Sequence, residues 1–579
     1  MQAVTITAAT VLPDVTGLDK TFDYLVPDAL AAQVRVGSLV RITLAGRRVG
    51  GWVVRLGAPS PDVAVSKLVP IAAWSGHGPD ASTIDLARWA ATRWGTDRLR
   101  PFLVTAGPHT RVRAIGASVR RSAGPLPGVG AGVRRLIDDG GGVVRISPTD
   151  DVLPVVLALA ERGTSLVIHP GHDARMLLAA QLRAVGLTVA VVPDDWALAA
   201  AGTDVVLGGR AAAWAPAPQL AGVMVIDEHD ESLQEERTPT WHARDVAIER
   251  SARAGVPCVL VSPCPTVTAL AWSGARWMRP SVADERSGWP IIDVVDRTDE
   301  EPWKRSLLTS RLIEALRDPS LTIVCVHNTP GRARLLACRS CRSLITCERC
   351  EAAVAQTDDG TLACHRCGIV RPPVCQRCGS GAMANVRPGV TRLREELEVA
   401  ASRSVVAVTG ESDDLPAAGV YVGTEAVLHR VRSADVVAFL DIDAELLAPR
   451  YRAAEQAIAL LVRAARLVGP RSGGGRIIVQ TFSPEHPVIQ SALLADPGRL
   501  AKVEAARRRD LGLPPFSALA RVSGTGADEF VAASGLPAAP DGDGFLVRAP
   551  SWDGLGPVLA ATPRPKGSRL RIEVDPARR

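Results

Sequence analysis

The sequence predicts a multidomain α/β protein with two parallel-sheet lobes, a cysteine-rich insert, a β-rich amino-terminal domain and a small α+β carboxy-terminal domain. The chain has 579 residues, which is too many for a single hydrophobic core. Strand-like apolar runs alternate with helical stretches over residues 135–303 and again over residues 304–484. This alternation is typical of parallel sheets covered by helices. Four Cys-x-x-Cys pairs interrupt the second series within residues 338–378.

The composition is that of a globular protein, with 47% hydrophobic and 22% charged residues. Lysine supplies only five of the 67 basic residues, so the positive charge is nearly all arginine. Arginine makes bidentate contacts with phosphate, which favours a nucleic-acid partner, although a GC-rich genome would favour arginine codons equally. The longest apolar run, residues 152–160, is too short to span a membrane. We therefore expect a soluble, cytoplasmic protein with no membrane partner.

Residues 1–107 are expected to form the β-rich domain. Within it, GSLVRITLAGRRVGGWVVRLG has the pattern of two strands joined by a Gly/Arg turn, and STIDLARWAATRWG has the pattern of a helix. Residues 108–134 are rich in Gly, Pro and Arg, and we expect them to be a linker.

The two lobes account for most of the predicted strands. In residues 135–303 the candidates are GVVRIS, SLVIHP, LTVAVVP, TDVVLGG, VMVIDE and CVLVSP. In residues 304–484 they are LTIVCVHN, SVVAVTG, GVYVGTE, DVVAFLDID and RIIVQTF. Residues 485–579 are expected to form the carboxy-terminal domain, which closes with the strand candidate GSRLRIEVD.

The four cysteine pairs have the spacing of metal-binding knuckles. They are Cys338/Cys341, Cys347/Cys350, Cys364/Cys367 and Cys375/Cys378. Each knuckle can place two thiolates on one ion, so four knuckles can complete two tetrahedral sites, for which zinc is the expected metal. All-thiolate sites leave no position open for water, which predicts a structural role. The stretch between the second and third knuckles has the size of a hairpin and favours a nested pairing, but spacing does not exclude a sequential one.

Asp227 and Glu228 follow the apolar run GVMVI, as do the carboxylates that hold magnesium in many nucleotide sites. A strand end before a helix cap has the same pattern. A phosphate loop needs glycines followed by a lysine, and no lysine of this chain follows a glycine. Where the loop would open the first lobe, the sequence is VVRISPTDDVLPVV, in which Asp150 and Asp151 would repel phosphate and Pro148 lacks an N–H. We therefore do not expect ATP or magnesium to bind.

Several strings place the chain beside a known family. They are KTFDYLVP, GGRAAAWAP, VMVIDEHDES, WHARDVA, the four knuckles, VVAFLDIDAELLAPRYRAAEQ, VQTFSPEHPVIQ, RRRDLGLPPFSA and IEVDP. In this order they resemble the PriA family of primosomal replication-restart proteins, which are superfamily-two DNA helicases with a two-zinc insert. The resemblance covers nearly the whole chain and implies that the two lobes are RecA-like.

The resemblance also implies partners and site residues. It implies binding to forked or single-stranded DNA, recruitment of primosome and helicase-loading proteins, and single-stranded-DNA-binding protein as a candidate partner. In the family, residues that match Phe22, Asp23 and Lys67 capture the 3′ end of the nascent leading strand. The family nests its knuckles, which here would assign one zinc ion to Cys338, Cys341, Cys375 and Cys378 and the other to Cys347, Cys350, Cys364 and Cys367.

Three departures from the family affect the motor. RISPTDDV replaces its Gly-Lys-Thr loop, VSPCP at residues 261–265 replaces a Gly-Ser-Ala-Thr-Pro motif, and LVRAARLVGPR at residues 461–471 replaces the motif whose arginines reach the γ-phosphate. Asp227 and Glu228 would then be vestigial rather than catalytic. The linker at residues 108–134 is also too short for the family's winged-helix domain.

Three functions remain as hypotheses. The first is a replication restart protein that recognises stalled or branched forks and starts primosome assembly, reloading the replicative helicase without helicase activity of its own. The second is an active ATP-dependent 3′–5′ DNA helicase with an atypical nucleotide site. The third is a zinc-containing scaffold for protein interactions.

Overall fold

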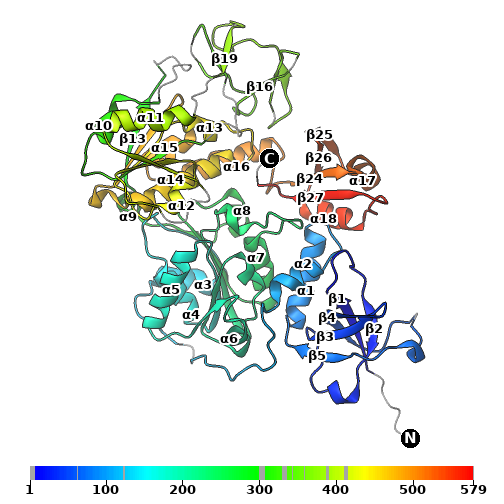
Figure 1. The fold of residues 1–579 in the computed structure, drawn as a ribbon. Helices are drawn as coiled ribbons and strands as arrows, with labels where there is room; N and C mark the ends of the chain where they lie inside the picture. Colours follow the sequence, from blue (N-terminus) through cyan, green and yellow to red (C-terminus); the bar gives the residue numbers. More distant parts are fainter. Residues whose placement is uncertain are drawn as a thin grey trace.

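The computed structural model describes residues 7–61, 63–121, 124–298, 307–328, 336–341, 343–357, 359–364, 366–385, 390–409 and 415–577. Figure 1 shows the two lobes one above the other, with the amino-terminal and carboxy-terminal domains beside them and the cysteine-rich module beyond the second lobe. The predicted fold class is confirmed by the sheets described below.

The amino-terminal domain contains a five-stranded antiparallel sheet in the order β2-β1-β4-β3-β5. The strands are β1 (Ala8–Pro13), β2 (Phe22–Leu25), β3 (Leu39–Leu44), β4 (Arg47–Gly57) and β5 (Ala73–Gly76). Ala45 and Gly46, with φ of 47° and 77°, form the two-residue turn between β3 and β4. Two helices follow, α1 (Ala81–Arg93) and α2 (Arg100–Ala106), and the predicted strands and helix of this region are confirmed.

The first lobe contains a seven-stranded parallel sheet in the order β12-β6-β11-β10-β7-β9-β8. The strands are β6 (Gly141–Arg145), β7 (Thr164–Ile168), β8 (Val189–Val192), β9 (Val205–Gly208), β10 (Leu220–Ile226), β11 (Cys258–Ser262) and β12 (Trp277–Met278). The helices are α3 (Ala131–Asp138), α4 (Leu153–Ala160), α5 (His172–Ala184), α6 (Trp196–Ala201), α7 (Ala243–Ala254), α8 (Val267–Ser273) and α9 (Val282–Ser287). Central strands are buried on both faces, which explains their unbroken apolar sequences.

The second lobe contains a six-stranded parallel sheet in the order β13-β23-β22-β14-β21-β20. The strands are β13 (Ile291–Asp296), β14 (Ile323–Val326), β20 (Val405–Val408), β21 (Val420–Gly423), β22 (Val436–Phe439) and β23 (Arg476–Thr481). The helices are α10 (Ser310–Leu316), α11 (Val390–Ala401), α12 (Val427–Arg430), α13 (Asp443–Leu446), α14 (Ala453–Val468), α15 (Pro487–Leu493) and α16 (Pro497–Asp510). Because β13 pairs with β23, this sheet begins before residue 304, where the sequence suggested the boundary.

Two smaller regions complete the fold. The cysteine-rich module has β15 (Leu336–Cys338), β16 (Ala355–Gln356), β17 (Leu362–Ala363), β18 (Val370–Arg371) and β19 (Met383–Asn385). The carboxy-terminal domain is an antiparallel sheet in the order β25-β26-β24-β27. Its elements are β24 (Ala518–Thr525), α17 (Ala527–Ser534), β25 (Ala538–Asp541), β26 (Gly544–Ala549), α18 (Trp552–Ala561) and β27 (Arg569–Val574).

A single hydrophobic core joins the amino-terminal domain, the first lobe and the carboxy-terminal domain. Phe102 of α2 packs against Trp214 of the first lobe, with 5.3 Å between ring centroids, and α1 packs against α18. The second lobe has separate cores on the two sides of its sheet. Among the described residues, no helix is both long and apolar enough to cross a membrane.

Candidate functional site

The eight knuckle cysteines form two clusters, and within each cluster the four sulfur atoms lie within 4.8 Å of one another. One cluster consists of Cys338, Cys341, Cys375 and Cys378, and the other of Cys347, Cys350, Cys364 and Cys367. The Sγ–Sγ distance is 3.5 Å between Cys338 and Cys378 and 3.4 Å between Cys347 and Cys367. Four thiolates at Zn–S distances of about 2.3 Å are separated by similar distances, so each cluster can hold a metal ion and has the donor set that zinc favours.

The nested arrangement arises from strand pairing. β15 pairs antiparallel with β19, which places Cys338 opposite Met383 and brings the first and last knuckles together. β17 pairs with both β16, which follows the second knuckle, and β18, which follows the third. Gly368 and Gly379 follow the third and fourth knuckles with φ of 77° and 75°, a conformation that glycine adopts without strain. The pairing that spacing left open is therefore nested.

The remaining cysteines lie away from the module. Cys258, Cys264 and Cys325 are buried in the two lobes, as expected for small core residues. Burial raises the pKa of the Cys258 thiol and of the Cys325 thiol to about 12, so both stay protonated at neutral pH.

The residues predicted to capture a DNA end lie along one edge of the amino-terminal sheet. Phe22 and Asp23 begin β2, and Lys67 ends the short helix η2 (Val65–Lys67). The chain after Lys67 runs beside β2, because the Leu25 N–H donates to the Val69 carbonyl at 3.0 Å. Phe22 is half-buried, and Lys67 is exposed. The sequence-distant segments are thus brought side by side.

The Asp23 carboxylate is hydrogen-bonded within the amino-terminal domain. Its carboxylate accepts from the Thr10 hydroxyl and from the Ser60 N–H, both at 2.6 Å. Its side chain is only 2% exposed. Burial would raise the pKa of Asp23, but the hydrogen bonds from Ser60 and Thr10 outweigh burial and lower it. Asp23 therefore ties the loop at Ser60 to the sheet, and its contact with a DNA hydroxyl stays a prediction.

Asp227 lies at the carboxyl edge of the first sheet and is neutralised by an arginine of the second lobe. Arg466 of α14 donates from Nη1 and Nη2 to the two carboxylate oxygens of Asp227, at 2.6 and 2.7 Å. The Nε of the same guanidinium donates to the Pro148 carbonyl at 3.0 Å. Arg466 therefore joins Asp227 to the segment that replaces the phosphate loop. We call this contact the interlobe ion pair.

The interlobe ion pair is charged at neutral pH. Burial would raise the pKa of Asp227, but the Arg466 guanidinium outweighs burial and holds that pKa well below its usual range. Burial likewise would lower the pKa of Arg466, and Asp227 outweighs it. A guanidinium thus occupies both oxygens of the carboxylate that a nucleotide site would use to hold magnesium.

The segment around Pro148 is folded to satisfy its own polar groups. The Ser147 N–H donates to the Asp150 carboxylate at 2.8 Å, and the Thr149 hydroxyl donates to the Gly288 carbonyl at 3.0 Å. A Cβ at Gly288 would lie 2.4 Å from the Ser147 Cβ, so the chain packs directly on this turn. These donors face protein acceptors, and the residues present do not fit a nucleotide triphosphate.

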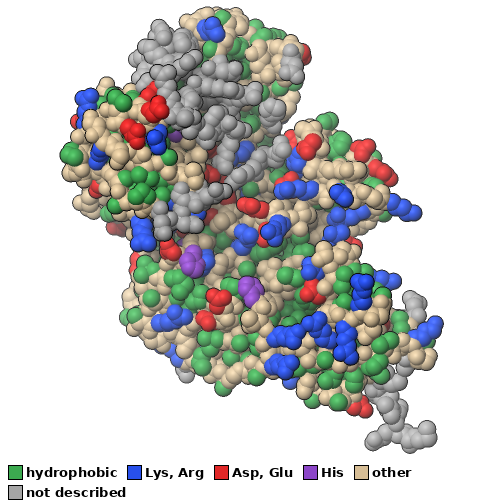
Figure 2. All heavy atoms as spheres, in the orientation of Figure 1, with side chains coloured by type: hydrophobic (Ala, Val, Ile, Leu, Met, Phe, Trp, Pro, Cys, Tyr) green, Lys and Arg blue, Asp and Glu red, His purple; other side chains and the backbone are tan. Residues whose placement is uncertain are grey.

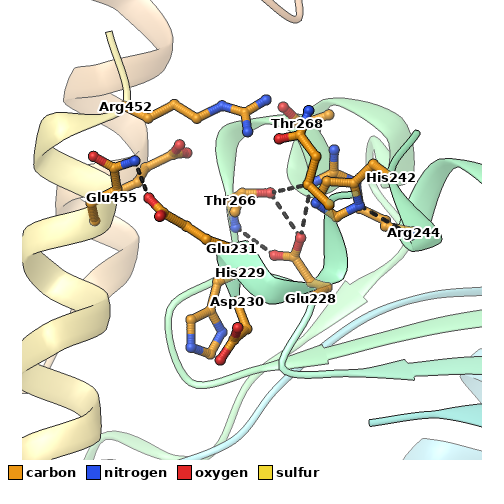
Figure 3. Close-up of a pocket in the computed structure, with 12 residues that line it drawn as sticks. Glu228, His229, Asp230, Glu231, His242, Arg244, Thr266, Thr268, Arg452 and Glu455 are labelled. Atoms are coloured by element: carbon orange, nitrogen blue, oxygen red, sulfur yellow. Dashed lines mark hydrogen bonds and ion pairs between the residues drawn. The ribbon is translucent and has the colours of Figure 1, made fainter. Parts of the chain in front are cut away.

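Glu228 is fully buried and anchors α8. Figure 3 shows its carboxylate turned toward Thr266 and Arg244. The Thr266 N–H and hydroxyl donate to it at 2.7 and 2.9 Å, and Arg244 Nη1 donates at 3.3 Å. Thr266 is also the N-cap of α8, since its hydroxyl accepts from the Ala269 N–H. The hydrogen bonds of Glu228 therefore stabilise the start of α8.

Further charged residues form contacts between the second lobe and the first. Arg463 of α14 donates to Asp230 at 2.6 Å, and Glu455 of the same helix accepts from the Val267 N–H at 2.7 Å. Arg145 of the first lobe pairs with Asp496 beside α16 at 3.0 Å. The sequence identifies residues 461–471 only as a replaced motif and does not predict the contacts that Arg463 and Arg466 make with the first lobe. Their separation by three residues, which puts both on one helix face, was the available signal.

Comparison with known proteins gives a family context. Residues 10–99 match the family model of the PriA 3′ DNA-binding domain. The replication restart protein PriA of Thermotoga maritima is 29% identical over 361 residues, which cover 57% of this chain and 47% of that protein. The chain is a relative of PriA. The match to Bacillus subtilis PriA, 28% identical, likewise covers 58% of this chain and 45% of that protein, so this chain matches less than half of either PriA.

A PriA from mycobacteria matches over a greater length. The probable replication restart protein PriA of Mycobacterium tuberculosis is 28% identical over 578 residues, which cover 88% of this chain and 85% of that protein. Among solved structures, yeast Dbp5 bound to RNA and ADP BeF3 covers 66% of this chain at 10% identity, with a TM-score of 0.32. That score is too low to support an argument, so the description of the two lobes rests on their parallel sheets alone.

Proposed function

We propose that this PriA relative is a replication restart protein that recognises stalled or branched forks and starts primosome assembly without hydrolysing ATP. The observation that supports the absence of hydrolysis is the interlobe ion pair, in which Arg466 occupies both oxygens of Asp227. Magnesium could bind this carboxylate only after Arg466 had left, which would break a bidentate ion pair at a buried carboxylate.

The DNA-binding part of the proposal rests on the amino-terminal domain. Its match to the PriA 3′ DNA-binding domain supports binding of a 3′ end near Phe22 and Lys67. An aromatic ring can stack on a terminal base, and an exposed lysine can meet a phosphate. Primosome and helicase-loading proteins, and single-stranded-DNA-binding protein, are the proposed protein partners.

We expect zinc-loaded protein to show no ATP hydrolysis above a protein-free control, with or without a forked DNA that has a free 3′ hydroxyl. Phosphate release checks this. Fluorescence anisotropy should show tighter binding to the fork than to plain duplex. Binding should be unchanged by ATP and weaken steeply with salt, because arginine contacts to phosphate release counterions.

Two other outcomes would replace the proposal. Hydrolysis that is stimulated by DNA and abolished by Asp227→Asn would establish an active helicase. Equal affinity for forked and plain duplex DNA would instead favour a scaffold for protein interactions whose DNA affinity is incidental.

A further inference from the structure

In the amino-terminal domain and the linker beside it, most acidic residues have partners, whereas several arginines form no ion pair. Most of its described acidic residues have partners within the domain: Asp14 pairs with Arg100, Asp19 with Arg98 and Asp85 with Arg88, while Asp23 ties a loop and Asp80 caps α1. Within residues 7–113, six described arginines form no ion pair with any described residue, namely Arg35, Arg41, Arg47, Arg48, Arg111 and Arg113. Arg47 pairs with Leu44 and lies on the face of Val40 and Ile42. We call the other five the β5-edge arginines, because they lie on or beside the β4-β3-β5 part of the sheet.

Arg41 and Arg48 lie on the sheet itself. Val40 and Ile42 are buried on one face of β3, which places Arg41 on the other. In the β3–β4 register Thr43 faces Arg48, and Arg41 faces Gly50, which has no side chain to cover it. Since directly paired residues point to the same side of a sheet, the two arginines share a face.

Arg111 and Arg113 are held against the neighbouring strand. The His77 N–H donates to the Val112 carbonyl at 2.7 Å, directly after β5 ends at Gly76. A Cβ at Gly76 would lie 2.5 Å from that carbonyl oxygen, so this close approach requires glycine. Val112 is buried while the arginines on both sides of it are exposed. The linker is thus fixed here with its arginines outward.

Arg35 completes the cluster from the loop before β3. It is exposed, and it lies near enough to His77 that its charge adds to the effect of burial in lowering the pKa of His77. No acidic residue occurs in residues 108–121 of the linker. Figure 2 shows Lys and Arg side chains gathered over the part of the molecule that carries α1, β3 and β5.

The β5-edge arginines lie on the half of the sheet farther from the predicted 3′-end residues. The sheet order β2-β1-β4-β3-β5 puts two strand spacings between β2 and Arg48 of β4, three between β2 and Arg41 of β3, and four between β2 and β5. At about 4.8 Å per spacing, the cluster extends from about 10 to about 19 Å from β2. Duplex DNA rises about 3.4 Å per base pair, so these distances correspond to about three to six base pairs.

We propose that the β5-edge arginines bind the phosphate backbone of a duplex arm of the fork, about three to six base pairs from the 3′ end held at β2. The inference rests on the proposed function and extends it with a second contact surface. Arginine rather than lysine favours phosphate, because its planar fork donates two parallel hydrogen bonds. An acidic protein is the alternative partner.

The test compares two quadruple variants of the full, zinc-loaded chain by anisotropy over a salt series. The edge variant is Arg41→Gln, Arg48→Gln, Arg111→Gln and Arg113→Gln. The matched control changes four exposed arginines of the two lobes, Arg286, Arg317, Arg432 and Arg499, to Gln. Each lost phosphate contact lowers the slope of log K against log salt by about 0.9, so the edge variant should lose up to about 3.6 and bind at least about tenfold more weakly. The control should retain the wild-type slope.

Additional DNA substrates and variants test whether the arginines contact the duplex part of the fork. The edge variant should match wild type on single-stranded DNA with a free 3′ hydroxyl and differ on a fork whose hairpin-capped arm has twelve base pairs. Arginine-to-lysine substitution at the same positions should restore most of the slope, because the charge remains. An unchanged melting temperature verifies folding.

Equal slopes for the edge variant and wild type would overturn the inference, as would loss of an acidic protein partner with DNA binding intact. The proposed function is judged separately, by the wild type's preference for forks over plain duplex. Preference for a free 3′ hydroxyl over a 3′ phosphate should persist in the edge variant, since the β2 edge is untouched.

Discussion

Asp227 and Arg466 belong to different lobes, and leaving either one without its partner would lower the stability of the fold. Asp227 has a 6% exposed side chain, and the Arg466 side chain is 35% exposed. A partly buried charge that loses its partner must either remain unpaired or draw in water. The bidentate geometry, with two short hydrogen bonds, compensates for the water that both groups give up on folding.

Arg466→Gln should lower the free energy of unfolding by about 1–3 kcal/mol, less than for a fully buried pair because Arg466 is partly exposed. Asp227→Asn should act similarly, and the double variant should be less destabilised than the sum, which denaturant unfolding would measure. Arg162→Gln, which breaks an exposed pair with Asp138, serves as the control and should cost at most about 0.5 kcal/mol. Additive effects would show that the two side chains are not coupled.

The same pair predicts a pH dependence. Because the pKa of Asp227 is lower in the folded chain than its ordinary value of 3.8, the pair stabilises the fold fully above pH 3.8. Its contribution declines as the pH falls below that value toward the folded-state pKa. The difference in unfolding free energy between wild type and Asp227→Asn should therefore shrink between pH 5 and pH 3. A constant difference over this range would argue against the ion pair.

At the scale of elements, short strands position the cysteine ligands and one helix positions the interlobe arginines. The cysteine-rich module has only two- and three-residue strands, and its hydrophobic cluster is built largely from the cysteines themselves. Such a module has too little apolar surface to fold alone, so bound metal is expected to provide most of its stability. One face of α14 packs in the core of the second lobe, and Arg463 and Arg466 of the same helix contact the first lobe.

We expect purified protein to contain two zinc ions, measured by elemental analysis. The nested arrangement makes a specific prediction for double variants. Cys338→Ser with Cys378→Ser should retain one zinc ion, and Cys338→Ser with Cys350→Ser should retain none. Sequential pairing would give the reverse. Cys325→Ala, in the core of the second lobe, is the control and should retain both ions.

At the scale of the whole molecule, contacts between the lobes favour one arrangement. Arg145, Arg463 and Arg466 each form an ion pair across the interface, and the carboxy-terminal segment adds to it. Gln234 of the first lobe donates to the Asp575 carbonyl at 2.9 Å, and Asp575 also accepts from Tyr451 of the second. A motor driven by nucleotide would have to break and remake these contacts in each cycle.

We therefore expect the radius of gyration measured by X-ray scattering to be unchanged by an ATP analogue. The triple variant Arg145→Gln, Arg463→Gln and Arg466→Gln should expand, because three carboxylates lose their partners across the interface between the lobes. Arg88→Gln, Arg162→Gln and Arg253→Gln remove three exposed pairs that lie within single regions, and this control should keep the wild-type dimensions. Compaction of the wild type by the analogue would contradict a fixed arrangement.

The sequence by itself determined the features that depend on neighbours along the chain. Apolar runs gave the strands of both lobes, because buried parallel strands need continuous apolar residues. The Cys-x-x-Cys spacing gave eight ligands, because two thiolates in one tight turn can meet one ion. The lack of any lysine after a glycine excluded a phosphate loop of the usual kind.

Only the tertiary structure decided which distant segments meet. Asp227 and Arg466 are 239 residues apart, and their contact depends on how two lobes dock. The same holds for the membership of β13 in the second sheet, for the nested knuckles, and for the linker arginines beside β5. The local sequence pattern predicts which element a segment forms. Which segments pair with one another is determined by tertiary packing, and no single segment encodes it.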